Sequence, residues 1–232
     1  MKLYTLDPNS RLATNITKIS RVLKMDVLVK GVDILDLDTI VVIGDGTPDD
    51  IAFSLIAYHL NGDKIAGIVK PPGRTGLGVS DLIPTYLKGK VRKIMVLMDQ
   101  EDEPLNTICE RIQNSLKKLA KCKIKIIDEE GKSEKRQKVY KCKYGGKEFE
   151  LILVINGLDE IHTDKHTIED HLLKVAEMLS IKVEDFETSK EAWKSIERRH
   201  VEIFKGLKEK RNIVGSVFPQ QIKGCEYLKS IS

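Results

Sequence analysis

Cysteine is scarce in this chain, and its spacing argues against the common cysteine-based metal sites. The 232 residues contain four cysteines, and no two of them form a C-x-x-C pair: Cys109, Cys122, Cys142 and Cys225. Structural zinc sites usually contain such pairs, so we do not expect one here. We expect free thiols in a reducing, cytoplasmic compartment, although an intracellular disulfide would fit a protein from a hyperthermophile.

Long apolar runs and aromatic residues are also lacking. No run reaches the roughly eighteen apolar residues of a transmembrane helix, so we expect no membrane partner. The first residues lack the apolar core of a signal peptide. With one tryptophan in the whole chain, no platform for stacking bases is evident. The net charge of +4, from 39 basic against 35 acidic residues, is too small to indicate nucleic-acid binding by itself.

The chain does contain a regular alternation of strand and helix patterns. Short apolar runs bounded by charge or glycine predict strands that are buried on both faces, and amphipathic segments lie between them. The predicted strands are 39–43, 65–69, 94–98 and 123–127, and the predicted helices are 50–61, 79–88 and 106–119. This order predicts an α/β fold with an open, mainly parallel, Rossmann-like sheet and helices on both faces.

The rest of the chain adds a hairpin and more helices. Alternation on both sides of Gly145-Gly146 predicts a β-hairpin over 139–155, whose edge could pair with a second chain in a homodimer. A helix is predicted over 167–179. We expect an N-terminal extension packed on the core (1–38), the α/β core (39–180) and a mainly helical C-terminal extension (181–232).

Acidic clusters follow two of the predicted strands. Asp45, Asp49 and Asp50 come directly after 39–43, and the run from Asp99 to Glu103 comes directly after 94–98. Ligands of open α/β sheets bind beyond the carboxyl ends of the strands, and carboxylates gathered there repel one another unless a divalent cation neutralises them. We therefore predict a site for Mg²⁺, with Mn²⁺ as a substitute. The predicted ligands are Asp45, Asp49, Asp99, Glu101 and Asp102.

The ordered motifs resemble those of the TOPRIM domain, the topoisomerase–primase fold. Asp45-Gly46-x-x-Asp49 resembles the Glu-Gly-x-x-Asp motif, and Asp99-x-Glu101, about fifty residues later, resembles Asp-x-Asp. The glycine-rich segment from Lys70 to Gly78 is similar to a loop of small TOPRIM proteins and of overcoming-lysogenisation-defect nucleases. The acidic helix start at 166–173 looks like one found late in those domains. The resemblance covers roughly 39–180.

This resemblance implies a Mg²⁺-dependent enzyme that acts on phosphodiester bonds of a nucleic acid, either as a nuclease or in nucleotidyl transfer. The residues that match the motifs, Asp45, Asp99 and Glu101, would be catalytic. The loop between them would contact phosphate through Lys70, Gly73 and Arg74, because Lys and Arg are suited to phosphate oxygens.

Two departures from the family motifs keep other functions open. Asp45 stands where the family has glutamate, and Glu101 where it has aspartate, although Asp102 could substitute. A displacement of about 1 Å can cost roughly a hundredfold in rate. One alternative is therefore a catalytically weakened TOPRIM module that binds or regulates. The other is a metal-dependent phosphohydrolase or phosphotransferase that acts on a small molecule.

Purely structural interpretations also exist for each acidic pair and for the histidines. Asp49-Asp50 could cap a helix, Glu101–Glu103 could form a solvated loop, and Glu169-Asp170 fits the first turn of a helix, where the dipole favours negative charge. The three histidines of this region are expected in surface or capping roles rather than on a metal: His162, His166 and His171.

Overall fold

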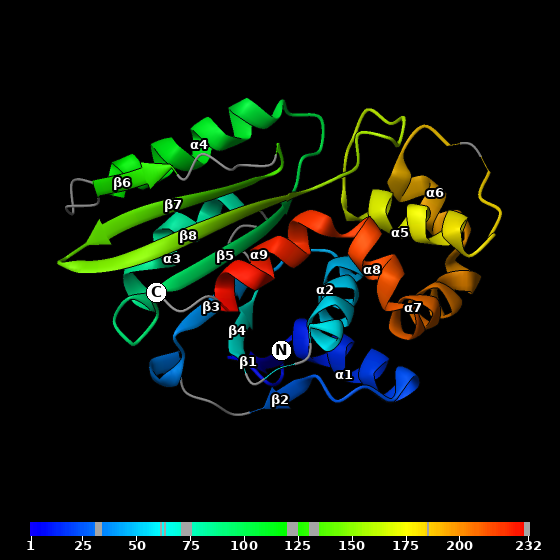
Figure 1. Cartoon of the computed structure of the whole chain (residues 1–232), viewed down its shortest axis with the longest axis horizontal. Coiled ribbons are helices and arrows are strands. Elements are labelled where there is room, and N and C mark those ends of the chain that lie inside the picture. The colour runs from blue at the N-terminus through cyan, green and yellow to red at the C-terminus, as the bar shows by residue number, and fades with distance from the viewer. Residues whose placement is uncertain are drawn as a thin grey trace.

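An eight-stranded sheet runs through the protein (Figure 1). The structure is a computed structural model that describes residues 1–30, 34–60, 62, 64–70, 76–119, 125–129, 135–184 and 186–229. The strand order is β2-β1-β4-β3-β5-β8-β7-β6. The strands are β1 (Lys2–Thr5), β2 (Leu28–Lys30), β3 (Thr39–Val42), β4 (Ile65–Val69), β5 (Lys93–Asp99), β6 (Lys125–Glu129), β7 (Gln137–Tyr144) and β8 (Lys147–Asn156).

The predicted fold class is confirmed: the sheet is open and mainly parallel, and it carries a hairpin. Neighbouring strands are parallel from β2 through β8, and β7 runs antiparallel to both of its neighbours. Gly145 and Gly146 turn the β7–β8 hairpin with φ angles of 54° and 88°, which glycine adopts without steric cost. In the pairing of β5 with β8, Asp99 lies opposite Asn156 at the carboxyl ends of both strands.

The N-terminal residues contribute to the sheet itself. We predicted 1–38 as an extension packed on the core, and the structure places β1 inside the sheet, between β2 and β4. The intervening helix α1 (Arg11–Leu23) starts at Ser10, whose hydroxyl accepts a hydrogen bond from the Ala13 amide at 3.2 Å. Such a cap satisfies one of the helix's free N–H groups.

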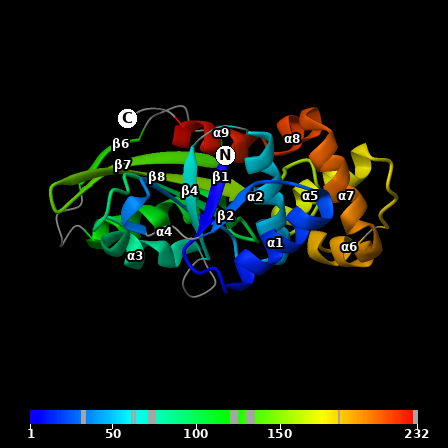
Figure 2. The same ribbon diagram turned by 90° about the horizontal axis from the view of Figure 1, so that it is seen from below.

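Helices cover both faces of the sheet, as predicted. Apolar side chains that alternate along β5 point to opposite faces: Met95 and Leu97 join one hydrophobic core, and Ile94 and Val96 join the other. Figure 2 shows α3 and α4 on one side of the sheet and α9 on the other. The helices are α2 (Thr47–His59), α3 (Val79–Tyr86), α4 (Leu105–Lys118), α5 (Ile168–Met178), α6 (Ser189–Ser195), α7 (His200–Glu209), α8 (Arg211–Val217) and α9 (Pro219–Lys229). In the described parts of the chain, no helix is long and apolar enough to cross a membrane.

The C-terminal region is helical, and its last helix, α9, lies directly on the sheet. A Cβ atom added at Gly224 would lie 2.8 Å from Val154 Cγ2 of β8 and 2.9 Å from Met95 Cε of β5. This close approach requires a glycine at that position. It also brings the buried glutamines of α9, Gln220 and Gln221, beneath the carboxyl end of β8.

The thiols of Cys142 and Cys225 are buried and free, as predicted, and Cys109 is also buried. Burial raises the pKa of the Cys142 and Cys225 thiols to about 12. Because the thiolate is the reactive form, these two thiols are inert at neutral pH. Cys122 lies outside the described residues.

An acidic cleft at the carboxyl edge of the sheet

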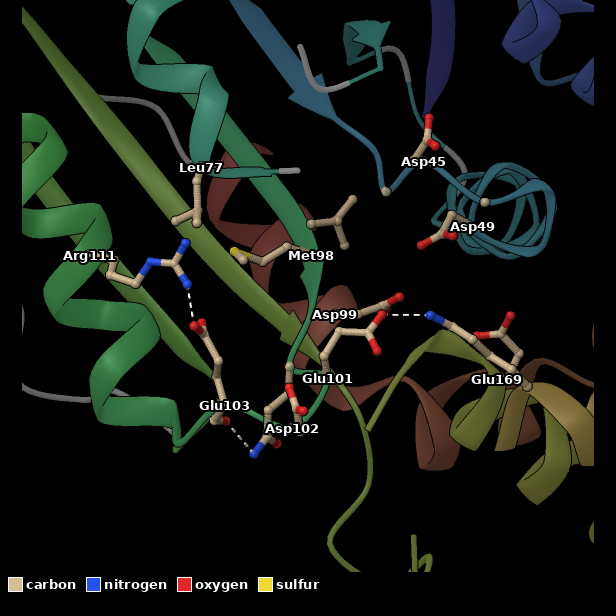
Figure 3. Close-up of a pocket in the computed structure, with 15 residues that line it drawn as sticks. Asp45, Asp49, Leu77, Met98, Asp99, Glu101, Asp102, Glu103, Arg111 and Glu169 are labelled. Atoms are coloured by element: carbon tan, nitrogen blue, oxygen red, sulfur yellow. Dashed lines mark hydrogen bonds and ion pairs between the residues drawn. The ribbon is translucent and has the colours of Figure 1, made fainter. Parts of the chain in front are cut away.

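A cleft of about 540 Å³ opens at the carboxyl ends of β3 and β5 (Figure 3). Its walls come from the turn between β3 and α2, from the loop after β5 and from the first turn of α5. Because β3 and β5 are adjacent and parallel, their following loops meet at the same edge. The acidic residues that line it are Asp45, Asp49, Asp99, Glu101, Asp102, Glu103 and Glu169, and the basic ones are Arg111 and Lys190.

Asp99 is held in place by two hydrogen bonds. Its Oδ1 accepts from Asn156 Nδ2 and from the backbone N–H of Ile168, each at 3.0 Å. Ile168 is the first residue of α5, so Asp99 also caps that helix. Burial raises the pKa of Asp99 to about 7 and the charges of Glu169 and Glu101 add to this, whereas the Asn156 hydrogen bond and Lys190 oppose it. Near neutral pH, Asp99 therefore exists in both protonation states.

Asp49 lies in the first turn of α2 and is buried, with 5% of its surface exposed. Its carboxylate turns back over the preceding glycines: a Cβ at Gly46 would lie 2.6 Å from Asp49 Oδ2, and one at Gly44 would meet Oδ1. The N-cap of α2 is Gly46, so the predicted capping role of Asp49 and Asp50 is wrong. Burial raises the pKa of Asp49 well above its usual range, and the charge of Asp99 raises it further.

Lys70 is occupied by the turn that leads into α2. Its ammonium pairs with Asp50 and donates to the carbonyl oxygens of Gly44 and Gly46, the latter at 3.0 Å. Asp50 also accepts a hydrogen bond from Asn15 Nδ2 at 2.8 Å. Lys70 therefore holds the turn together in this structure, and its predicted phosphate contact stays a prediction. The other two predicted contacts, Gly73 and Arg74, lie outside the described residues.

Glu169 is the site residue that sequence reasoning missed. It lies in the first turn of α5, is 8% exposed and lines the cleft. Among the described residues, its Oε2 has no hydrogen-bond partner. Its charge raises the pKa of both Asp49 and Asp99, and all three residues line the same cleft. The place of Glu169 in the first turn of a helix was predicted correctly, and its place in the cleft was not predicted.

Asp170, the neighbour of Glu169, does not line the cleft; its Oδ2 has partners, and its Oδ1 has none among the described residues. Its Oδ2 accepts from His166 Nδ1 at 2.8 Å and from the Leu158 amide at 3.1 Å. These contacts tie the loop after β8 to α5. The two acids of this helix start therefore differ in function: Asp170 builds the loop, and Glu169 faces the cleft.

Asp45, Glu101 and Asp102 lie at the rim rather than at the centre. Figure 3 shows Asp45 apart from Asp99, with its carboxylate directed away, and both Asp45 and Asp102 are exposed. Glu101 has a φ of 55°, and its carboxylate accepts from Lys190 Nζ at 2.6 Å. We expected Asp99 and Glu101 to share one side of a continuing strand, but β5 ends at Asp99 and the left-handed backbone of Glu101 breaks the alternation. Asp45, Asp99 and Glu101 line the same cleft, but among the described residues they do not form the close metal-holding group that we expected.

The histidines do not gather into one cluster. His162 is exposed, and His166 is paired with Asp170. His171 was expected at the surface or in a cap and is instead fully buried beneath the cleft. Burial lowers its pKa to about 4, so the ring is neutral at neutral pH.

The donor chemistry of the cleft fits a hard divalent cation. The buried groups are carboxylates, which Mg²⁺ prefers, and Glu169, which has an unpartnered oxygen among the described residues, lines the same cleft. Within the described ranges, however, no three acidic, histidine or cysteine side chains form a ready-made metal group. The cleft is thus a loose acidic cluster rather than a preformed metal centre. No protein-family model matches this chain, and no match was found among curated proteins or solved structures.

Proposed function

We propose that this protein binds a divalent cation, Mg²⁺ or Mn²⁺, in the acidic cleft and acts on phosphodiester bonds of a nucleic acid. The observation that carries the proposal is the buried carboxylate of Glu169, which has an unpartnered oxygen among the described residues and lies near Asp49 and Asp99. Buried like charges are costly, and a bound cation removes that cost. The position at the carboxyl edge of a parallel sheet also supports a ligand site.

Asp49, Asp99 and Glu169 would hold the cation, and they take the central place that we first assigned to Asp45 and Glu101. Mg²⁺ needs only one or two protein carboxylates, because water and phosphate oxygens complete its coordination. When bound, the ion would polarise a phosphate oxygen and lower the pKa of water. The side chain of Asn156 and the start of α5 keep Asp99 oriented for this role.

The walls of the cleft supply positive charge for a phosphate group. Lys190 projects from α6, and Arg111 from α4, where it pairs with Glu103. Both side chains are about half exposed, so a phosphate can reach them. The nucleic-acid class of the substrate comes from the resemblance of the two acidic motifs to TOPRIM proteins.

A catalytically weakened binding or regulatory module is the second candidate, and a specific observation favours it. Glu101 is already neutralised by Lys190, and Asp45 lies apart from the buried carboxylates. Catalysis depends on geometry more strictly than cation binding does. Such a module would bind the cation and a nucleic acid without cleaving it.

Thermal unfolding with and without Mn²⁺ or Mg²⁺ tests cation binding. At about 5 mM, roughly 100-fold above a Kd of about 50 µM, the cation should add about 2.7 kcal/mol to the stability of the native chain. Glu169→Gln should lose most of this gain, because it removes a proposed ligand. Asp102→Asn, an exposed acid of the same cleft, is the matched control and should keep it. An unchanged melting temperature for the native chain with every ion would refute the proposal.

Cleavage assays then separate the enzyme from the binding module. Labelled single- and double-stranded DNA and RNA are incubated with the protein and Mn²⁺ or Mg²⁺. Cleavage that is lost in Asp99→Asn supports the enzyme. Cation-dependent stabilisation without cleavage of any of the four substrates supports the binding module. Cleavage that survives in Asp99→Asn would show that the assigned cleft is not the active site.

A further inference from the structure

A chain of buried polar side chains runs from the cleft down to the C-terminal helices. Asn156 Nδ2 donates to Asp99 Oδ1 at 3.0 Å, and Gln221 Nε2 donates to Asn156 Oδ1 at 2.9 Å. Gln221 Nε2 also faces His171 Nε2 at 3.2 Å. Asn156, Gln221 and His171 are each at most 1% exposed, so solvent does not substitute for any of these contacts.

The groups at the two ends of this series of side chains fix the direction of every hydrogen bond between them. The carbonyl oxygen of Val217 can only accept, so His171 Nδ1, 2.6 Å away, carries the proton and donates to it. His171 Nε2 then accepts, both from the backbone N–H of Gly157 at 3.1 Å and from Gln221, so the group that Gln221 turns toward it is its NH₂. The same NH₂ donates to Asn156 Oδ1, which leaves the NH₂ of Asn156 to face the carboxylate of Asp99.

We propose that Gln221 of α9 is a positioning residue for the cleft. An asparagine amide can present either its oxygen or its NH₂ to a neighbour, and the oxygen would repel the Asp99 carboxylate. Gln221 holds the Asn156 amide so that the NH₂ faces Asp99. The helix α9 is in this way linked to Asp99, which lies more than a hundred residues earlier in the sequence. The part of this inference that concerns cation binding rests on the proposed function.

Gln220 provides a matched control. It is the preceding residue of α9, it is 5% exposed, and its Nε2 also faces His171 Nε2, at 3.2 Å. Its other contact is the carbonyl oxygen of Gly157 at 3.3 Å rather than Asn156. Gln220→Met and Gln221→Met make the same chemical change in the same buried region. Only Gln221→Met releases the Asn156 amide.

The test compares these two variants in the full chain by two readouts. The first is the Mn²⁺ affinity, which we expect to weaken about tenfold in Gln221→Met, the lower end for residues that orient metal ligands, and to stay within about twofold in Gln220→Met. The second is the NMR signal of the Asn156 side-chain NH₂ in metal-free protein, which should move in Gln221→Met alone. A merely structural role would lower the thermal stability of both variants and shift both readouts alike.

Equal Mn²⁺ affinities together with an unmoved Asn156 signal in Gln221→Met would overturn the positioning role. If the native chain does not bind Mn²⁺, the proposed function fails, and the Asn156 signal alone decides the orientation that we infer. If Gln221→Met does not fold, side-chain amide exchange in the native chain decides. The Asn156 and Gln221 amides should then exchange at least about tenfold more slowly than that of the exposed Asn106, and exchange as fast as Asn106 would overturn the inference.

Discussion

Two buried polar groups lie next to each other in this protein, and they are satisfied to different degrees. In the lower group, the nitrogen atoms of His171, Asn156 and Gln221 all have partners, and only Gln221 Oε1 lacks one among the described residues. In the acidic cleft above it, Glu169 has an unpartnered oxygen, and the pKa of both Asp49 and Asp99 is raised by burial.

The difference distinguishes buried polar side chains that stabilise the fold from buried carboxylates that lack a partner and that a bound ligand would neutralise. A buried network in which all but one of the polar atoms have partners specifies one packing arrangement, so nothing is gained by removing its members. Unpartnered buried carboxylates lower stability, and such groups are typical of functional sites. Substitutions in the two groups should therefore change stability with opposite signs.

Lys70→Met should have the largest effect, a loss of about 3 kcal/mol in the free energy of unfolding. Lys70 neutralises the buried carboxylate of Asp50 and ties two carbonyl oxygens of the turn, and removing one partner of a buried pair leaves the other charge uncompensated. The figure is at the low end of that class because Lys70 is 23% exposed and is partly screened. Urea denaturation measures the loss.

The double variant Lys70→Met/Asp50→Asn is the control for this prediction. It removes both charges and keeps an oxygen that Asn15 can contact, so it should recover at least half of the loss. A loss below about 1 kcal/mol in the single variant would mean that the ammonium is not needed by the turn. Lys70 would then be free for the phosphate contact predicted from the sequence.

The pH dependence of stability should report on the lower group, because His171 belongs to it and is buried in its neutral form. Its folded pKa is about 4 and its ordinary value is 6.5, so between these values the unfolded chain takes up a proton that the folded chain does not. Stability is therefore lost as the pH falls from about 6.5 to about 4, by up to about 3 kcal/mol. His171→Gln should flatten this part of the profile, measured by urea denaturation at each pH. The same acid-side slope in native and variant chains would contradict the prediction.

The cleft should give a slope of the opposite sign. The folded pKa of Asp99 is about 7 and the ordinary value is 3.8, so the unfolded chain loses its proton first as the pH rises. Stability of the metal-free protein is therefore lost between about pH 4 and pH 7 on account of Asp99, and Asp49 acts in the same direction. The two slopes overlap in the native chain, and the His171→Gln variant exposes the one that belongs to the cleft.

Glu169→Gln should stabilise the metal-free protein by about 1 kcal/mol at pH 8, because it removes a buried negative charge beside two other carboxylates. Most substitutions of buried residues destabilise, so a gain is informative. Glu177→Gln, on an exposed position of the same helix, is the control and should change stability by less than about 0.5 kcal/mol. A loss above about 1 kcal/mol would show that Glu169 is part of a satisfied network after all.

Much of the fold could be predicted from the sequence because its signals are local. Apolar runs predict the strands β3 and β5, and a glycine pair predicts the β7–β8 hairpin. Each of these signals lies within a few residues of sequence. The place of β1 between β2 and β4 could not be predicted, since its four residues carry no distinctive pattern and its neighbours in the sheet are set by distant pairing. The sequence indicates which segments form strands more clearly than the order in which they pair.

The site was predictable where it depends on strand ends and not where it depends on single backbone angles. Asp49 and Asp99 line the cleft because they follow adjacent parallel strands. Glu101 was misplaced because a left-handed φ at one residue redirects its side chain. The roles of Glu169 and Gln221 in the site were not predicted because their interactions with it join segments more than fifty residues apart, and neither residue type is unusual in a helix.

Lys190→Met should have the smallest effect on stability, below about 0.5 kcal/mol, because the Lys190–Glu101 pair is 49% and 40% exposed. Partial burial lowers the pKa of Lys190, but the charges of Glu101, Asp99 and Glu169 outweigh this effect and raise it. The ammonium of Lys190 therefore already interacts favourably with the negative charges of the cleft. Urea denaturation of the native and variant chains without metal measures whether Lys190 also neutralises the buried carboxylates of the cleft. A small change means that the buried carboxylates remain uncompensated with Lys190 present. A loss of about 2 kcal/mol or more would mean that Lys190 neutralises them, and the contrast between the two buried groups would then disappear.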